Sequence, residues 1–307
     1  GKHMNKHPLE LIGSNGADYL VGVGKDHVCS HTTGGTMCWG DNAYHQTDHV
    51  PIFDDFTIGE SHICAVDEGK IQCRGDDSKG QLLPPPNPRV HNVVAGDNHN
   101  CGYSWRHLQK HADIRCWGDS SLGQTDAPKA PESLMMDNWG GKAPLISAGS
   151  NHTCAIWPNN DLKKEGAHKV LCWGDNELGQ THAPEGVYSQ VVSGKNHNCA
   201  IELQTKAVTC WGDNQKGQTN APSGQFEKLY AGGHVTCGIR PGNNNLSDLV
   251  CWGDTTHGLT KIPESPDGIP IEWWGTIHRM KANGAKRHTH LSLSETRACA
   301  IVAPGLP

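Results

Sequence analysis

The chain has 307 residues, of which 35% are hydrophobic, and it contains only 3 Phe but 37 Gly, 13 Cys and 10 Trp. Its formal net charge is −6, so it lacks the basic field of a nucleic-acid-binding protein. No apolar run reaches the length of a membrane span. These values argue against nucleic-acid binding and membrane insertion. They indicate a turn-rich fold with a small core that is stiffened covalently.

The N-terminal segment GKHMNKHP, residues 1–8, is expected to be an expression-vector remnant before a mature start, which is compatible with a signal peptide removed earlier. Residues 9–307 are expected to form one domain, because two sequence motifs recur along it. The first is a glycine turn ending in cysteine: GKDHVC at 24–29, GESHIC at 59–64, GDNHNC at 96–101, GSNHTC at 149–154, GKNHNC at 194–199 and GGHVTC at 232–237. The second is CWGDNAYHQT at 38–47, CRGDDSKGQL at 73–82, CWGDSSLGQT at 116–125, CWGDNELGQT at 172–181, CWGDNQKGQT at 210–219 and CWGDTTHGLT at 251–260.

Each unit predicts three strands: a β-type run before the glycine turn, a strand with His-x-Cys, and a strand with Cys-Trp-Gly. Residues 203–207 are too few for a crossover helix, so the strands are expected to pair as antiparallel hairpins. Strand-only units of about 40 residues favour an all-β, seven-bladed β-propeller of short antiparallel blades. The expected repeats are about 17–51, 52–89, 90–143, 144–186, 187–225, 226–275 and 276–302.

The seventh copy, HTHLSLSETRACAIV at 288–302, is degraded. Its spacing predicts His288 at the repeat histidine, His290 at the first cysteine position and Cys299 at the second. It lacks the CWGD continuation, and the N-terminal strand 9–15 resembles that missing piece. We therefore expect the N- and C-terminal segments to close the ring together in one blade, which would hide open sheet edges.

Twelve cysteines fall into in-repeat pairs that face each other across a hairpin, where a disulfide fits. Zinc binding is the alternative, but CxxC knuckles are absent. Disulfides predict an oxidising location: secreted, periplasmic, or a cell or virion surface. Cys299 is expected to be a free thiol. The predicted pairs are Cys29–Cys38, Cys64–Cys73, Cys101–Cys116, Cys154–Cys172, Cys199–Cys210 and Cys237–Cys251.

His288, His290 and Cys299 also form a weak candidate metal site, because residues i and i+2 of a strand share one face and Cys299 would lie opposite. The competing interpretation is a repeat that has lost its cysteine pair. No cofactor is otherwise expected. The sequence shows no Ser/His/Asp series, no paired carboxylates and no phosphate loop, so we expect a protein that is not an enzyme.

Three recurring residues each have a structural and a functional interpretation. The Trp after the second Cys either packs between blades or offers a glycan platform. The Asp after Gly suits an Asx turn, with Ca²⁺ binding as the alternative. The repeat His is expected to hold a side-chain-to-backbone clamp rather than a metal. Recurrence in blade after blade favours the structural interpretation of all three.

The pattern Gly-x-x-His-x-Cys-Ala-Ile followed by Cys-Trp-Gly-Asp-Asn-x-x-Gly-Gln-Thr resembles the repeat of the regulator of chromosome condensation family. The resemblance covers about residues 10–302 and is closest to the short, cysteine-bearing versions of exported proteins. That family includes a nuclear exchange factor, a plant ultraviolet photoreceptor and a secreted β-lactamase inhibitor with short three-stranded blades. Trp105-Arg106-His107 occurs once, unlike the photoreceptor pattern, and the cysteines argue against a nuclear role. Because the blades are short and export is expected, the resemblance implies an inhibitor-like binder, although it supplies no contact residue.

Function is expected where the repeats differ. Three hairpins are extended, at 102–115, 155–171 and 238–250, and two linkers are long, at 126–144 and 261–287. All three hairpins occupy one repeat position, so we expect them on one rim of the propeller, binding a protein partner. A glycan-binding lectin is the alternative, and a metal-dependent enzyme is a third class. The predicted contact residues are Trp105, Arg106, His107, Trp139, Trp157, Lys163, Lys164, Trp273 and Trp274.

Overall fold

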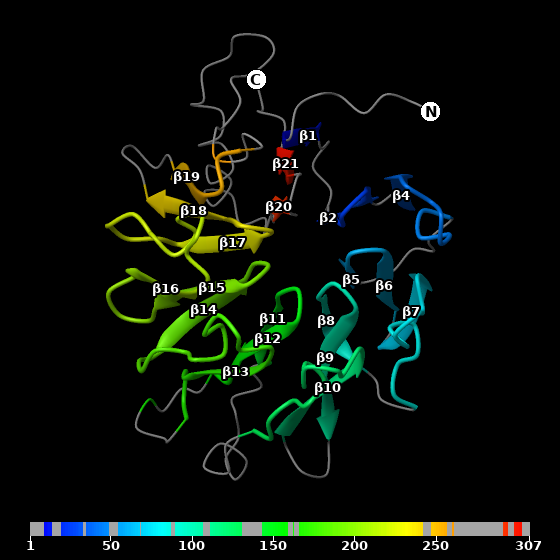
Figure 1. The fold of residues 1–307 in the computed structure, drawn as a ribbon, viewed down its shortest axis with the longest axis horizontal. Helices are drawn as coiled ribbons and strands as arrows, with labels where there is room; N and C mark the ends of the chain where they lie inside the picture. The colour runs from blue at the N-terminus through cyan, green and yellow to red at the C-terminus, as the bar shows by residue number, and fades with distance from the viewer. Residues whose placement is uncertain are drawn as a thin grey trace, which may run out of the picture.

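Six three-stranded antiparallel sheets follow one another along the chain and are arranged around a common centre (Figure 1). The computed structural model describes residues 9–13, 20–32, 35–48, 55–67, 69–86, 90–106, 111–130, 143–158, 162, 166–241, 247–256, 260, 291–293 and 298–302. In that part of the chain there is no helix long and apolar enough to cross a membrane. The predicted all-β architecture of repeated antiparallel sheets is confirmed.

In each of these sheets, numbered 1 to 6 in chain order, a middle strand pairs with an inner and an outer strand. The inner strands are β2 (Leu20–Val23), β5 (Asp55–Ile58), β8 (His91–Ala95), β11 (Leu145–Ala148), β14 (Tyr188–Ser193) and β17 (Lys228–Gly232). The middle strands are β3 (His27–Thr32), β6 (His62–Asp67), β9 (His99–Arg106), β12 (His152–Ile156), β15 (His197–Glu202) and β18 (Val235–Pro241). The outer strands are β4 (Gly35–Gly40), β7 (Lys70–Gly75), β10 (His111–Gly118), β13 (Val170–Gly174), β16 (Val208–Gly212) and β19 (Ser247–Gly253).

A further sheet joins the two ends of the chain. It consists of β20 (Leu291–Leu293), β21 (Ala298–Val302) and β1 (Leu9–Gly13) in the order β1-β21-β20. β21 is antiparallel to β20, but β1 runs parallel to β21, whereas the outer strand of every other sheet is antiparallel. A parallel outer strand needs no hairpin, and here it comes from the opposite end of the chain.

The register of this sheet corrects the prediction for the seventh copy. Ser292, not His290, stands opposite Cys299 on β20, and Glu10 stands opposite it on β1. Cys299 lies on the middle strand, where the other repeats have their first cysteine. The apolar residues set this register, because Leu293 is buried against Val235 and Cys237 of sheet 6.

All six predicted disulfides are present. The paired cysteines lie directly opposite each other on the middle and outer strands, with Cα atoms 4.0–4.1 Å apart: Cys29–Cys38, Cys64–Cys73, Cys101–Cys116, Cys154–Cys172, Cys199–Cys210 and Cys237–Cys251. This distance belongs to a non-hydrogen-bonded antiparallel pair, the position at which two strands approach most closely. Each bridge therefore joins the strands of one sheet and crosses no sheet boundary.

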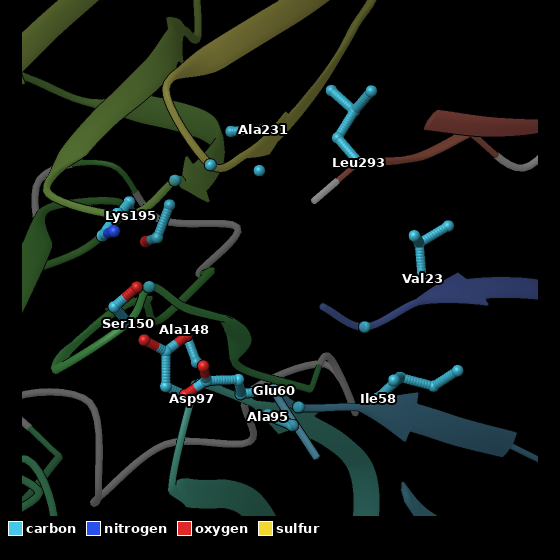
Figure 2. Close-up of a pocket in the computed structure, with 18 of the residues that line it drawn as sticks. Val23, Ile58, Glu60, Ala95, Asp97, Ala148, Ser150, Lys195, Ala231 and Leu293 are labelled. Atoms are coloured by element: carbon cyan, nitrogen blue, oxygen red, sulfur yellow. The ribbon is translucent and has the colours of Figure 1, made fainter. Parts of the chain in front are cut away.

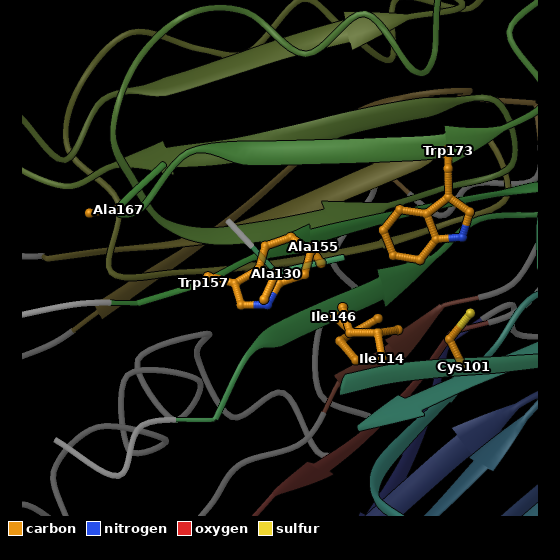
Figure 3. Packing of buried hydrophobic residues seen from close by; sticks show 8 residues of the cluster. All are labelled: Cys101, Ile114, Ala130, Ile146, Ala155, Trp157, Ala167 and Trp173. Atoms are coloured by element: carbon orange, nitrogen blue, oxygen red, sulfur yellow. The ribbon is translucent and has the colours of Figure 1, made fainter. Parts of the chain in front are cut away.

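The hydrophobic core lies between neighbouring sheets. In the cluster of Figure 3, Cys101 and Ile114 of sheet 3 pack against Ile146, Ala155 and Trp173 of sheet 4. Similar clusters join sheets 4 and 5 and sheets 5 and 6. Packing of apolar side chains therefore holds one sheet against the next, whereas the disulfides act inside each sheet.

The tryptophan of the outer strand adds a hydrogen bond at four of these boundaries. Its indole Nε1 donates to the backbone carbonyl of the glutamine in the preceding repeat's turn, at 3.0 Å each time: Trp117 to Gln81, Trp173 to Gln124, Trp211 to Gln180 and Trp252 to Gln218. We call this contact the Trp–Gln bond. The four indoles are 6–9% exposed, so the predicted packing between blades is confirmed.

The turn that presents this glutamine is fixed by the aspartate that precedes it, as predicted. Asp175 Oδ1 accepts a hydrogen bond from the Glu177 amide at 3.0 Å, which is an Asx turn. Gln180 is fully buried, and its Nε2 donates to Asp175 Oδ2 at 2.9 Å while its Oε1 accepts from the Leu178 amide at 2.8 Å. Its side chain thus holds the turn closed, and its carbonyl remains available to the next sheet.

Trp173→Phe removes one Trp–Gln bond and keeps most of the apolar contact. We expect it to lower the free energy of unfolding by about 1–3 kcal/mol, because the Gln124 carbonyl loses its indole donor in a buried place. Urea unfolding followed by fluorescence measures the change. Trp39→Phe is the matched control, since Trp39 is only partly buried and packs within the cluster of sheet 1. Equal losses in the two variants would contradict the role of the hydrogen bond.

Replacing Cys199 and Cys210 together by Ala opens one bridge that spans 11 residues of sequence. We expect a loss of roughly 2–4 kcal/mol in the free energy of unfolding, because the cross-link restricts the unfolded chain. Because that bridge acts inside sheet 5, its removal and Trp173→Phe should lower the free energy of unfolding additively. A double-mutant cycle tests this independence, and a large interaction energy would contradict it.

Candidate functional site

A cavity of about 340 Å³ lies where the turns of the sheets converge (Figure 2). Each of the six repeat sheets contributes the end of its inner strand and the glycine turn after it, and β20 contributes Ser292 and Leu293. The cavity therefore lies at the centre of the arrangement, and every sheet supplies part of its wall.

Glycine is required in these turns because neighbouring sheets touch there. A Cβ added to Gly96 would lie 2.3 Å from the Gly149 carbonyl of the next sheet and 2.3 Å from the ring of His99. Gly59 and Gly149 have the same environment, with the next carbonyl at 2.6 and 2.4 Å. The G-x-x-H pattern thus allows the sheets to approach closely at the centre.

Backbone hydrogen bonds link the same glycine turns from one sheet to the next. The amide after the turn glycine donates to a carbonyl in the turn of the next sheet, in a continuous series from sheet 1 to sheet 6: Lys25 to Glu60 at 3.2 Å, Glu60 to Asp97 at 3.2 Å, Asp97 to Ser150 at 3.1 Å, Ser150 to Lys195 at 3.2 Å, and Lys195 to Gly233 at 2.6 Å. This series places the side chains after each glycine in a fixed order around the cavity.

The repeat histidines lie behind these turns and are fully buried. In four of them, Nε2 bonds a side chain of the next sheet: His62 to Asn100 Oδ1 at 2.9 Å, His99 to Thr153 Oγ1 at 2.8 Å, His152 to Asn198 Oδ1 at 2.8 Å, and His197 to Thr236 Oγ1 at 2.7 Å. The predicted clamp to backbone is wrong in its partner, because neighbouring sheets are close enough for side chains to meet. We call this contact the His bond.

Burial determines the protonation state of these rings. It lowers the pKa of His152 to about 4 and that of His197 to about 3. Burial also lowers the pKa of His99 to about 3, and the charges that His152 and His62 would carry add to that effect. These histidines are therefore neutral near pH 7 and act as hydrogen-bonding groups between sheets.

The cavity wall has two chemically different parts. The residues directly before the turn glycines are mostly apolar, and those directly after them are mostly charged. Figure 2 shows Glu60, Asp97, Ser150 and Lys195 along one side of the cavity with Ala95 and Ala148 beside them, whereas Val23, Ile58 and Leu293 lie on the other. Lys25 and Glu60 form an ion pair at 2.6 Å.

The three predicted docking residues that the structure describes, Trp105, Arg106 and Trp157, do not line this cavity. Trp105 and Arg106 lie at the far end of the β9–β10 hairpin, opposite Ala112 and His111. Six others fall outside the described residues: His107, Trp139, Lys163, Lys164, Trp273 and Trp274. A docking surface made of this set therefore stays a prediction.

Trp157 corrects the prediction of an exposed anchor. It is 1% exposed and packs with Ala130, Ala155 and Ala167 in the core beside sheet 4 (Figure 3). The His168 amide, just before β13, donates to the Trp157 carbonyl at 3.0 Å. Trp157 therefore stabilises this extended segment.

The candidate metal site is not assembled in the described part of the chain. His288 and His290 lie outside it, and its His, Cys, Asp and Glu residues form no group of three that could hold a metal ion. The Ser292 register also removes the predicted position of His290 opposite Cys299.

Sequence reasoning missed the cavity-lining residues after each turn glycine. A signal was present, because this position changes in charge from repeat to repeat while the glycine, histidine and cysteine of the same motif stay constant: Lys25, Glu60, Asp97, Ser150 and Lys195. A structural role at one repeated place would favour one residue type, as it does for the histidine two residues later.

One family model matches a part of the chain. The regulator of chromosome condensation (RCC1) repeat matches residues 188–218, which span sheet 5 and its turn as far as Gln218. Residues 188–218 therefore carry an RCC1 repeat. The RCC1 repeat thus includes both the strands and the glutamine that serves the next sheet.

Solved structures resemble this RCC1-repeat protein over most of its length. The CRINKLY WD40 ectodomain of the Arabidopsis thaliana receptor kinase ACR4 is 27% identical, with a TM-score of 0.54 over 76% of this chain and 78% of that one. The ectodomain of the Physcomitrella patens receptor kinase CR4 is 21% identical, with a TM-score of 0.64 over 94% and 72%. Prp20p of Saccharomyces cerevisiae, described with its binding to Gsp1p and histones, is 14% identical, with a TM-score of 0.55 over 76% and 71%.

The buried histidines make the stability of this RCC1-repeat protein depend on pH. Their folded-state pKa values lie below the ordinary value of 6.5, so the unfolded chain binds protons that the folded chain does not. Stability is therefore full above about pH 6.5 and falls as the pH drops towards 4, by about 1.4 kcal/mol per pH unit for each such histidine.

Urea unfolding between pH 7 and 4.5 measures this slope. His152→Gln keeps a donor for Asn198 and should remove about one proton from the difference between the unfolded and folded states. His182→Gln, on an exposed turn, is the matched control. If His152→Gln leaves the pH dependence of the free energy of unfolding unchanged, that dependence does not come from His152.

Proposed function

We propose that this RCC1-repeat protein is a secreted or cell-surface binding protein without enzymatic activity, which recognises a protein partner. Six disulfides are typical of proteins that fold in an oxidising compartment. The 27% identity to a receptor-kinase ectodomain supports the same location.

We further propose that the fold is a seven-bladed propeller in which β20, β21 and β1 form the last blade. β20 contacts β17 on one side and β2 on the other, which supports closure between sheets 6 and 1. The Val23 amide donates to Ser292 Oγ at 3.1 Å across the second of these contacts. Closure would leave the two chain ends in one blade.

The observation that carries the binding proposal is the unequal length of the hairpins between middle and outer strands. β9 and β10 pair over eight residues and end at Arg106 and His111, whereas β12 and β13 pair over five and are joined by an insertion. The β9–β10 hairpin points away from the centre (Figure 1). We propose that the extended hairpins of sheets 3, 4 and 6 form the docking rim, with Trp105, Arg106, His107, Lys163 and Lys164 as contacts and Trp139, Trp273 and Trp274 beside them.

The lectin alternative loses its main support. A glycan platform needs an exposed ring face, and the indoles of Trp117, Trp173, Trp211 and Trp252 are buried between sheets. A protein partner is therefore the better proposal, because the extended hairpins are the places where the repeats differ.

A hairpin exchange tests this proposal with the disulfide frame intact. Residues 102–115 are replaced by SHTTGGTM, the segment that joins Cys29 to Cys38, so the pair Cys101–Cys116 keeps its register. The same graft into residues 65–72 of sheet 2 is the matched control, because it replaces a hairpin of equal length. Circular dichroism verifies folding of both.

The binding partner is first identified by cross-linking the intact protein to proteins of the cells that produce it. The partner is then purified. We expect one partner per chain and a loss of affinity of at least about 30-fold in the sheet 3 graft, which is the change produced by one strong contact residue. The sheet 2 graft should bind as the parent does. Full binding by grafts in sheets 3, 4 and 6 alike would contradict the proposed rim.

A further inference from the structure

The outer strand of sheet 2 differs from those of sheets 3 to 6. In the later sheets, the residue after the second cysteine is a tryptophan that lies against the preceding sheet and is only 6–9% exposed. Sheet 2 has Arg74 at this position on β7, and Arg74 is exposed. The boundary between sheets 1 and 2 therefore carries an exposed cation where the later boundaries carry a buried indole.

Three polar side chains of β7 share one exposed face. Lys70, Gln72 and Arg74 are exposed, and the residues between them are half-buried. Side chains at i, i+2 and i+4 of a strand point to the same side. Ile71 and Cys73 pack with the tryptophan of sheet 3, so the three polar side chains point the other way. This face thus carries two positive charges four residues apart, which is about 13 Å along a strand.

Neither of these positive charges has an ion-pair partner. In the described part of the chain, no ion pair involves Lys70 or Arg74. The carboxylate that responds to Arg74 is Asp48, whose pKa is lowered by hydrogen bonds from Asn42 and His45 and by the more distant guanidinium. Both oxygens of Asp48 already accept those two hydrogen bonds. The two cations of β7 are therefore available to a partner.

The backbone of β7 also has an unpaired side. β7 is the edge strand of its sheet and lies at the outside of the molecule (Figure 1). Cys64 and Cys73 form a non-hydrogen-bonded pair with Cα atoms 4.1 Å apart, so the N–H and C=O of Cys73 point away from β6. The same holds for Ile71, two residues earlier. No described residue outside the sheet forms a backbone hydrogen bond with either residue, so an added strand can pair with β7.

We propose that β7 binds an extended acidic segment of a partner protein, which adds a fourth, antiparallel strand to sheet 2. Residues of the added strand that stand opposite Lys70 and Arg74 share their face, so carboxylates at these places meet the two cations. Residues opposite Ile71 and Cys73 exchange backbone hydrogen bonds with β7 and lie on its half-buried face. The bound segment is thus acidic at its first and fifth positions and apolar at its second and fourth.

The charges of β7 select this kind of partner. Lysine on a sheet edge prevents indiscriminate strand pairing, and here it favours a strand of opposite charge. A sulfated glycan would need a denser basic surface, and the exposed Asp67 opposite Lys70 would repel it. The edge of sheet 2 is separate from the rim proposed on sheets 3, 4 and 6, so it serves a second protein segment.

Fluorescence anisotropy with the full chain tests the site. The labelled probe is the peptide acetyl-Gly-Glu-Val-Thr-Val-Glu-Gly-amide, and we expect saturable binding of one peptide per chain. Replacing both Glu by Lys, or permuting the centre to Val-Glu-Thr-Glu-Val, should weaken binding at least about tenfold, because each change takes the carboxylates from the two cations. Bound peptide should also slow hydrogen exchange of the Ile71 and Cys73 amides. No saturable binding, equal binding of the three peptides, or tighter binding of a heparin hexasaccharide would overturn the proposal.

Variants locate the binding on β7. Lys70→Gln and Arg74→Gln should each weaken it at least about fivefold, since each removes one charge contact. Arg74→Trp restores the residue of the later repeats, so it should weaken binding without lowering the free energy of unfolding. Arg115→Gln, on the outer strand of sheet 3, is the matched control, because Arg115 already pairs with Asp113 at 3.6 Å. Unchanged affinity in both glutamine variants overturns the site.

The graft into residues 65–72 separates this proposal from the proposed rim. It removes Lys70 and Gln72, so it should lose the acidic peptide and still bind the partner of the extended hairpins. The graft of sheet 3 should show the reverse. Retention of the peptide by the sheet 2 graft would contradict the edge site and leave the rim unaffected.

Discussion

The structure depends on a buried hydrogen-bond acceptor that recurs between neighbouring sheets. This acceptor is the backbone carbonyl of the glutamine in the Asp-x-x-x-Gly-Gln turn. Between sheets 4 and 5, the Gln180 carbonyl accepts from the Trp211 indole at 3.0 Å and from Asn198 Nδ2 at 2.8 Å. Asn198 Oδ1 in turn bonds His152 Nε2 at 2.8 Å. One carbonyl thus joins the outer strand, middle strand and turn of two sheets, in a buried place where a missing partner costs most.

This interaction is not distributed evenly around the centre. Trp–Gln and His bonds occur together at the four boundaries from sheet 2 to sheet 6. In sheet 2, Ile63 stands at the position that Asn100 and Thr153 occupy in sheets 3 and 4, and Arg74 replaces the tryptophan. Sheets 2 to 6 therefore form the firmly joined part of the molecule. The sheet that carries both chain ends meets sheet 1 through the Val23–Ser292 bond, and it meets sheet 6 through the packing of Leu293 against Val235 and Cys237.

The structural features that could be predicted from the sequence were those set by nearby residues or by the repeat. Cys199 and Cys210 face each other because both lie at fixed distances from one hairpin, and Asp213 caps its own turn, so both followed from spacing. The register of Cys299 did not, because burial of Leu293 against another sheet decides it. The burial of Trp157 was also missed, since an insertion can cover a residue or expose it. The cavity arises only when all turns converge, although the variable residue after each turn glycine indicated its wall.

Native-state hydrogen exchange tests the central claim most directly, because it reports the opening free energy of each strand separately. The account predicts that the amides of β14–β16, with Trp–Gln and His bonds on both sides, exchange only through global unfolding. The amides of β2–β4 should exchange through a partial opening whose free energy is lower than that of global unfolding. The difference between these two free energies should shrink in the Trp211→Phe variant. Protection of sheet 1 equal to that of sheet 5 in the parent protein, or earlier opening of sheet 5, would contradict the claim that the glutamine carbonyl joins the sheets.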